Sequence, residues 1–166
     1  MRLNLREIIG NPGSSLPFEA ELETEDLSFP AVVSYVGRPR AVGLVKNEAG
    51  VLSLTGELAA EMKCVCDRCG AEFLSRKVTP LHATLVDEDD GEDPELFPLE
   101  GTEIDLDEIL RTSFVLDMDS KFLCREDCKG LCPRCGKNLN LGPCGCGKET
   151  DPRFAVLGQL LEKETL

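Results

Sequence analysis

The cysteines are the feature that most limits how this chain can fold. Six of the nine lie within residues 124–146, CREDCKGLCPRCGKNLNLGPCGC, and the other three lie in CVCDRC at residues 64–69. The longer segment is rich in glycine-containing turns and has almost no apolar periodicity, so it cannot build a core of its own. Some other interaction has to hold this part of the chain in a fixed shape.

Eight of the nine cysteines form four close pairs, and this spacing is typical of zinc ligands. Two pairs are C-x-x-C followed by glycine, a turn in which two sulfurs converge and the glycine permits a left-handed backbone. Because zinc prefers four tetrahedral ligands, four pairs predict two structural sites, closed to water and substrate. The predicted metal ligands are Cys66, Cys69, Cys124, Cys128, Cys132, Cys135, Cys144 and Cys146.

The spacing leaves open which pairs share an ion. In one scheme the 132/135 and 144/146 pairs form a local site around the loop GKNLNLGP, and the 66/69 pair joins the 124/128 pair. In the other, the two C-x-x-C turns meet as a zinc ribbon and the remaining two pairs combine. Shorter loops close at a lower entropic cost, which favours the first scheme.

Other interpretations of the thiols stay open: inert core cysteines, a dithiol redox centre at CPRC, or iron in place of zinc. No βαβ pattern surrounds CPRC, and zinc is the commoner cytosolic occupant of a closed tetrahedral site. Cys64 is left over, and it fits the alternation of Leu58, Ala60 and Met62 as a core residue. His82 alternates with apolar neighbours, so we expect it on the polar side of a strand rather than at a metal.

Alternating apolar residues dominate positions 32–86 and predict an antiparallel sheet. NEAG separates two strand patterns in hairpin fashion, CDRCG caps a second hairpin, and LPFEAELE could add another strand. Residues 102–114 and 151–164 carry apolar residues at helical spacing and predict two short helices. The expected fold is α+β: a mainly antiparallel β-sheet domain with two short helices and a zinc-ordered, cysteine-rich C-terminal segment.

The acidic charge is concentrated in one segment. Residues 87–119 contain 14 acidic residues and one basic residue, and they account for the whole net charge of -13. Residues 87–103 are predicted to be an acidic loop. Before it lies a β region with one C-x-x-C turn (1–86), and after it lie a helix, the cysteine-rich segment and a C-terminal helix (104–166). We expect all three parts to form one compact domain. Such a loop is either a solvated segment or a docking surface for a cationic partner.

Residues 121–153 have the opposite charge balance, with seven Lys and Arg against four Asp and Glu. Phosphate would be repelled by the acidic segment, so any nucleic-acid contact is expected at this end of the chain. The candidate contacts to RNA or to a partner are Lys129, Arg134, Lys137, Lys148 and Arg153.

Several classes of protein are not indicated. The start lacks the apolar run of a signal peptide, and no apolar run reaches the roughly 18 residues of a membrane helix. We therefore expect a cytoplasmic protein with reduced thiols, to which the odd cysteine count also points. The chain has one histidine and neither a nucleophile-elbow nor a phosphate-loop motif, so we expect neither an enzyme nor a small-molecule substrate.

The motifs, in their order, resemble those of the YceD-like family over about residues 57–162. CDRCG after a strand, EIDLDEIL, CREDCKGLCPRCGKNLN with a later C-x-C, and DPRFAVLGQL carry the resemblance. It implies a role in 23S rRNA accumulation and large ribosomal subunit biogenesis. Together with the lack of a catalytic motif, this predicts a non-enzymatic factor whose partner is a large-subunit precursor, contacted through its rRNA or a basic ribosomal protein. The alternatives are a thiol redox or stress-sensing protein, and a zinc-ribbon interaction module unrelated to ribosomes.

Overall fold

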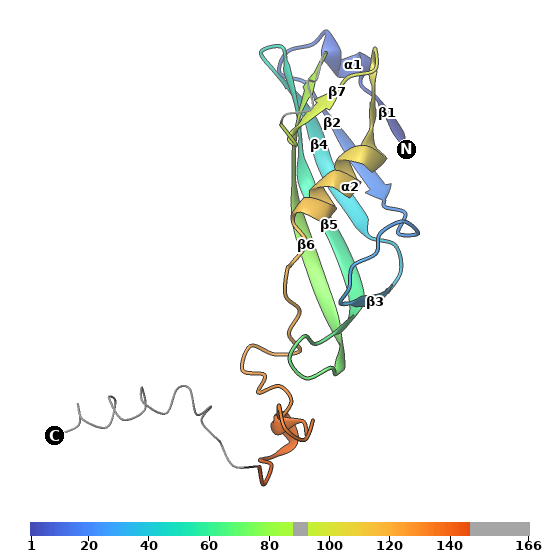
Figure 1. The fold of residues 1–166 in the computed structure, drawn as a ribbon. Helices are drawn as coiled ribbons and strands as arrows, with labels where there is room; N and C mark the ends of the chain where they lie inside the picture. Colours follow the sequence, from blue (N-terminus) through green and yellow to red (C-terminus); the bar gives the residue numbers. More distant parts are fainter. Residues whose placement is uncertain (88–92, 147–166) are drawn as a thin grey trace, which may run out of the picture.

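A long, twisted β-sheet with one helix packed on its face forms most of the computed structural model, which describes residues 1–87 and 93–146 (Figure 1). In the main sheet the strand order is β2-β4-β5-β6-β7, β3 pairs with β5 beside it, and β1 and β8 form a separate small sheet. The elements are β1 (Arg2–Asn4), α1 (Arg6–Ile9), β2 (Ser15–Glu21), β3 (Val32–Tyr35), β4 (Arg40–Glu48), β5 (Val51–Val65), β6 (Glu72–Val86), β7 (Leu96–Pro98), β8 (Glu103–Asp105), α2 (Leu106–Leu116) and the short 3-10 helix η1 (Leu139–Leu141).

The predicted antiparallel sheet is confirmed, and its two hairpins lie where the sequence indicates. At NEAG, Ala49 and Gly50 both adopt positive φ and turn β4 into β5. Strands β5 and β6 are 15 residues each and pair from Leu52↔Leu85 to Val65↔Glu72. At about 3.3 Å per residue, this hairpin is roughly 50 Å long. The CDRCG turn therefore lies at one end of the sheet, and α1 and β7 lie toward the other end (Figure 1).

The core lies between the sheet and α2. The alternation in β5 places Leu54, Leu58 and Met62 on the inner face, all fully buried, and Cys64 continues this row as predicted. From the helix, Phe114 packs between the rings of Phe29 and Tyr35. His82, as predicted, lies on the exposed side of β6.

Helix α2 begins at Leu106, within the predicted range 102–114, and residues 103–105 of that range form β8 instead. The Asp105 side chain accepts a hydrogen bond from the Asp107 N–H at 3.0 Å, which makes Asp105 the N-cap. The other predicted helix, residues 151–164, lies outside the described residues. None of the helices within the described ranges is long and apolar enough to cross a membrane.

Residues 87–103 differ from the expected acidic loop. Leu96, Phe97 and Pro98 form β7, which pairs in parallel with the end of β6, and β8 begins at Glu103. Phe97 is buried in the core. The acidic neighbours hide this short apolar stretch in the sequence. It becomes a strand because it pairs with β6, and no local pattern indicates that pairing.

The chain leaves α2 and runs along β6 toward the tip of the β5–β6 hairpin (Figure 1). Lys77 of β6 anchors this path through ion pairs with Asp117 at 3.0 Å and Asp119 at 3.4 Å. Only 14% of the Lys77 side chain is exposed, so these pairs are better shielded from solvent than most on the surface. The path ends beside the CDRCG turn, where Phe122 is buried.

Candidate metal centres

Four cysteines meet at the tip of the β5–β6 hairpin, and we call them the first cluster. Cys66 and Cys69 come from the hairpin turn, and Cys124 and Cys128 come from the loop that follows α2. All four sulfurs lie within 4.8 Å of one another. The Cys66 and Cys128 sulfurs are 3.8 Å apart, and those of Cys69 and Cys124 are 3.7 Å apart.

Backbone hydrogen bonds hold the two halves of the first cluster together. The Asp67 N–H donates to the Phe122 carbonyl at 2.9 Å, and the Phe122 N–H donates to Asp67 Oδ2 at 2.6 Å. Within the turn, the Gly70 N–H donates to the Cys66 carbonyl at 2.8 Å, with Gly70 at a φ of 68°. The left-handed glycine predicted after the second cysteine is therefore present, and Asp67 fastens the turn to the loop.

The other four cysteines, Cys132, Cys135, Cys144 and Cys146, form a second cluster, again with all sulfurs within 4.8 Å. Its C-x-x-C turn repeats the first: the Gly136 N–H donates to the Cys132 carbonyl at 2.9 Å, with Gly136 at a φ of 72°. The Cys132 and Cys144 sulfurs are 3.4 Å apart.

The structure groups the eight cysteines as in the scheme with the shorter loops. The zinc-ribbon scheme, in which the two C-x-x-C turns meet, is wrong, because each turn lies with a different neighbouring pair. The first turn is held at Phe122 through Asp67, and this places it against the 124/128 pair.

The backbone stabilises negative charge on one sulfur of each turn. Burial raises the pKa of the Cys66 thiol, but backbone N–H groups, first those of Cys124 and Cys69, outweigh this and lower the pKa to about 6. In the second cluster, the backbone N–H of Cys135 is the largest contribution that lowers the pKa of Cys132 to about 6. Thiolates are the form that binds metal, and both turns therefore favour it.

Two other sulfurs, those of Cys124 and Cys146, show the cost of gathering four thiols without a cation. Burial, and then the neighbouring sulfurs, raise the pKa of Cys124 to about 12. A hydrogen bond with Cys135 is the main cause that raises the pKa of Cys146 to about 12. A divalent cation placed among the sulfurs would supply the positive charge that four close thiolates need.

In the first cluster, the distances between sulfurs fit a single tetrahedral ion. Bonds of about 2.3 Å to four tetrahedral thiolates place neighbouring sulfurs about 3.8 Å apart. The 3.7 and 3.8 Å separations in the first cluster match this value, whereas a disulfide would require about 2.05 Å. A cluster of several irons spreads its thiolates over different metal atoms, so the compact grouping favours a mononuclear site.

Three of the predicted basic residues belong to the described part of the cysteine-rich segment. Lys129, Arg134 and Lys137 are exposed, and the Lys137 ammonium donates to the Pro143 carbonyl at 2.9 Å. Lys148 and Arg153 lie outside the described residues. Lys129 lies between the two clusters, and its backbone N–H donates to Asn140 Oδ1 at 2.8 Å.

Sequence reasoning missed three polar residues that organise the two clusters. Arg68 Nη1 donates to the Cys128 carbonyl at 2.9 Å, and Arg125 Nη2 donates to Asn140 Oδ1 at 2.7 Å. Asn140 Nδ2 in turn reaches the Cys128 sulfur at 3.3 Å. A signal for Arg68 was present, because both turns read C-x-R-C, whereas nothing local marks Asn140.

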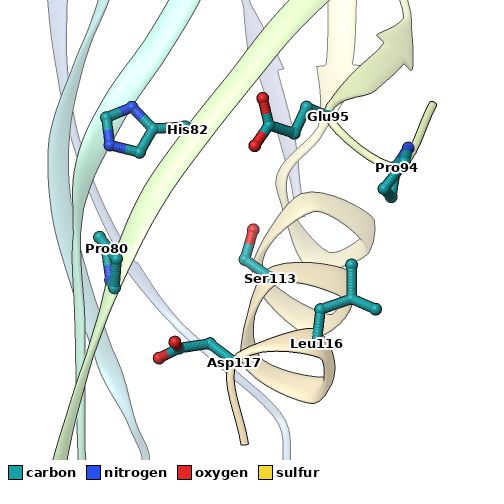
Figure 2. A pocket seen from close by; sticks show the side chains of 7 residues that line it. All are labelled: Pro80, His82, Pro94, Glu95, Ser113, Leu116 and Asp117. Carbon is teal, nitrogen blue, oxygen red and sulfur yellow. The ribbon is translucent and has the colours of Figure 1, made fainter.

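A separate hollow of about 250 Å³ lies between β6 and the end of α2 (Figure 2). It is lined by Pro80, His82, Pro94, Glu95, Ser113, Leu116 and Asp117. Its two carboxylates and lone imidazole do not come close enough to form a metal-binding group, since within the described ranges only the two cysteine clusters do so. The lining is acidic, which suits a cationic group better than a phosphate.

These features define a class: an α+β protein with a mainly antiparallel sheet and two four-cysteine candidate metal centres at one end. The chain belongs to the YceD family, because the model described as "Large ribosomal RNA subunit accumulation protein YceD" matches residues 54–161. This match includes both clusters.

Relatives at the sequence level agree with the family assignment. A chloroplastic protein of Arabidopsis thaliana, "Large ribosomal RNA subunit accumulation protein YCED homolog 1", is 40% identical over 75 residues, which are 45% of this chain and 23% of that protein. Uncharacterized proteins of Mycobacterium bovis and Mycobacterium tuberculosis are 34% identical over 122 residues, 70% of this chain and 58% of theirs. The chain thus matches less than two thirds of the length of these relatives. No solved structure matches.

Proposed function

We propose that this chain is a non-enzymatic cytoplasmic factor that supports 23S rRNA accumulation and large ribosomal subunit biogenesis. Each of its cysteine clusters holds a zinc ion, and the two ions order the region that carries Lys129, Arg134 and Lys137. Family membership over residues 54–161 carries the ribosomal part of this proposal. Deletion of the gene in the source organism should lower the ratio of 23S to 16S rRNA, and an unchanged ratio would overturn this part.

The sulfur separations carry the zinc part. Four thiolates at tetrahedral spacing leave no open coordination position, which suits a structural ion rather than a catalytic one. Zinc has no redox chemistry and is almost always tetrahedral in structural sites, so it fits a site whose role is to order the chain. The eight ligand residues are the cysteines of the two clusters, and Cys64 remains a buried thiol in the core.

Metal analysis of the native protein with a count of reactive thiols tests the zinc part. We expect two zinc ions per chain and little thiol reactivity until a chelator is added, after which eight thiols become reactive. Iron in place of zinc would change the identity of the ion but not the structural role. No metal together with reactive CPRC thiols would instead support a thiol redox or stress-sensing protein.

Direct contact with rRNA is supported by the charge at the metal-centre end. Lys129, Arg134 and Lys137 are exposed there, and the concentrated acidic segment lies elsewhere in the chain. Filter binding to large-subunit rRNA fragments over a range of salt concentrations measures this contact, because each neutralised phosphate adds about 0.7 to 0.9 to the salt slope. Replacing the three residues by alanine should reduce the slope by about two to three.

A matched variant controls for total charge. Arg6, Arg40 and Lys46 are exposed or partly exposed and belong to α1 and β4, away from the clusters, so their replacement by alanine should leave the salt slope unchanged. Equal losses in the two variants would contradict a specific contact. No salt-dependent retention of RNA by the unmodified chain would discard direct RNA binding and leave a protein partner.

A basic ribosomal protein is the second candidate partner, and the hollow in Figure 2 favours it. Glu95 and Asp117 line this hollow. Replacing Glu95 by glutamine should weaken association with large-subunit precursors in co-sedimentation, and should leave RNA filter binding unchanged; Asp117 is kept because it pairs with Lys77. Failure to co-sediment at all would favour a zinc-dependent interaction module unrelated to ribosomes.

A further inference from the structure

The two clusters are joined by one short stretch of backbone, residues 128–132. Cys128 belongs to the first cluster, and Cys132 to the second. Arg68 of the first turn holds this stretch on one side: its Nη1 donates to the Cys128 carbonyl at 2.9 Å, and its own carbonyl accepts from the Leu131 N–H at 3.1 Å. The first cluster thus fixes the segment from which the second turn begins.

The loop closed by the second cluster covers the other side of this stretch. The Leu139 N–H donates to the Gly130 carbonyl at 2.9 Å, and the Cys132 N–H donates to the Lys137 carbonyl at 2.8 Å. Gly130 has a φ of 73°, and a Cβ there would lie 3.0 Å from the Arg68 carbonyl oxygen. The joining stretch is therefore packed between the two halves with no room for a side chain at its centre.

Asn140 connects the two clusters through its side chain. It belongs to the loop between Cys135 and Cys144, yet its Nδ2 donates to the sulfur of Cys128 at 3.3 Å. Its Oδ1 accepts from the Lys129 N–H at 2.8 Å and from Arg125 Nη2 at 2.7 Å. The side-chain amide of Asn140 thus stabilises a sulfur of the first cluster. The position of this amide depends on the second cluster, because Asn140 lies in the loop that the second cluster closes.

The two clusters differ in how strongly the rest of the fold supports them. In the first, Cys66 and Cys128 are both 2% exposed and lie beside Phe73 and Leu123. In the second, Cys132 is buried but Cys135 is exposed, and turns make up most of its surroundings. The first cluster is thus built into the hairpin, whereas the second depends on the joining stretch for its position.

We propose that the two clusters bind metal cooperatively, with Asn140 as the positioning residue that transmits the coupling through its hydrogen bond to the Cys128 sulfur. This inference rests on the proposed metal binding. Outer-sphere hydrogen bonds to metal ligands typically change metal affinity by 10- to 100-fold when they are removed. Coupling is reciprocal, so metal in either cluster raises the affinity of the other by the same factor.

Cadmium titration of the full chain tests this coupling, because cadmium NMR gives each thiolate site its own resonance. Competition with a chelator then measures the affinity of the first cluster alone. Disabling the second cluster with Cys144→Ser and Cys146→Ser should weaken cadmium binding to the first by about tenfold or more. Asn140→Asp should cause a similar loss, since aspartate keeps an oxygen for Lys129 and Arg125 but has no N–H for the sulfur.

The combination of the two changes is the decisive measurement. If Asn140 transmits the coupling, Asn140→Asp adds little further loss once the second cluster is disabled. Leu141→Ala is the matched control: Leu141 is the next residue, its side chain is 84% exposed, and its replacement should change neither affinity. Asn140→Ala serves as a second variant if the aspartate disturbs folding.

Two results would overturn the inference, and both are distinct from a failure of the proposed function. First-cluster affinity that is unchanged by Cys144→Ser and Cys146→Ser would show that the sites are independent, although both still bind metal. Full additivity of Asn140→Asp with the cysteine changes would show that Asn140 does not transmit the coupling. The absence of any cadmium resonance in the unmodified chain would instead remove the metal part of the proposed function.

Discussion

Removing the metal is predicted to unfold residues 124–146 and leave the sheet intact. Ordering these 23 residues costs about 1 kcal/mol each in backbone entropy at the low end, or about 23 kcal/mol. Two thiolate sites supply about 10 to 16 kcal/mol apiece, which is comparable. Without them this segment keeps little, because no side chain of residues 124–146 except those of cysteines is buried in an apolar core.

Hydrogen exchange with and without a chelator, under reducing conditions, measures this prediction residue by residue. The amides of Leu131, Cys132 and Leu139 donate hydrogen bonds within the cysteine region, so their protection should vanish in the apo chain. Amides in the β4–β5 pairing should keep theirs, because the core between β5 and α2 contains none of the eight ligand residues. Retained protection at Leu131 and Leu139 in the apo chain, or simultaneous loss in β4 and β5, would refute the reasoning.

Two further predictions concern single side chains. Asp67→Ala leaves the partly buried Phe122 N–H without its acceptor, so it should lower the free energy of unfolding by about 1 to 3 kcal/mol and speed metal loss to a chelator. Asp67→Asn keeps an acceptor oxygen and should lower the free energy of unfolding less. Equal effects of the two changes would show that the hydrogen bond is unimportant. Tyr35 is the chain's one tyrosine, its hydroxyl is buried without a hydrogen-bond partner among the described residues, and burial raises its pKa. The neutral phenol is thus favoured in the fold, so this contribution to stability is complete below about pH 10 and is lost as the pH rises through the folded-state pKa. A tyrosinate absorbance titration should show the raised pKa, and Tyr35→Phe should remove this alkaline loss of stability; an ordinary titration curve would contradict it.

The parts of the fold that follow from local patterns were predicted from the sequence. Alternation in β5 placed Leu58 and Met62 in the core, and the glycine after each C-x-x-C turn predicted its left-handed backbone. Loop length was enough to favour the observed grouping of the eight cysteines, because the shorter closure is also the one that the structure adopts. These predictions succeeded because the causes lie within a few residues of their effects.

The parts that were missed depend on contacts between distant segments. Phe97 joins the sheet only because the end of β6 offers it an unpaired edge, and acidic neighbours hide it in the sequence. The helix α1 carries no capping side chain that would have marked it. Asn140 resembles any polar loop residue until the fold brings Cys128 within 3.3 Å of its amide. A polar side chain with such a role has no periodicity, and only the three-dimensional arrangement reveals it.

The first cluster attaches the cysteine-rich segment to the hairpin, and it would therefore orient any partner bound at the metal-centre end. Lys77 with Asp117, and Asp67 with Phe122, fasten the chain to the hairpin on the approach to the cluster, and the cluster itself completes the attachment. Under the proposed function, Lys129 and its neighbours then face a partner from one end of a hairpin roughly 50 Å long. The strand β7, beside the acidic residues, lies toward the opposite end (Figure 1). An rRNA and a basic ribosomal protein would therefore contact separated places on this fold. Because loss of the first ion releases the segment that carries Lys129, it should weaken RNA filter binding and leave binding of the ribosomal protein unchanged.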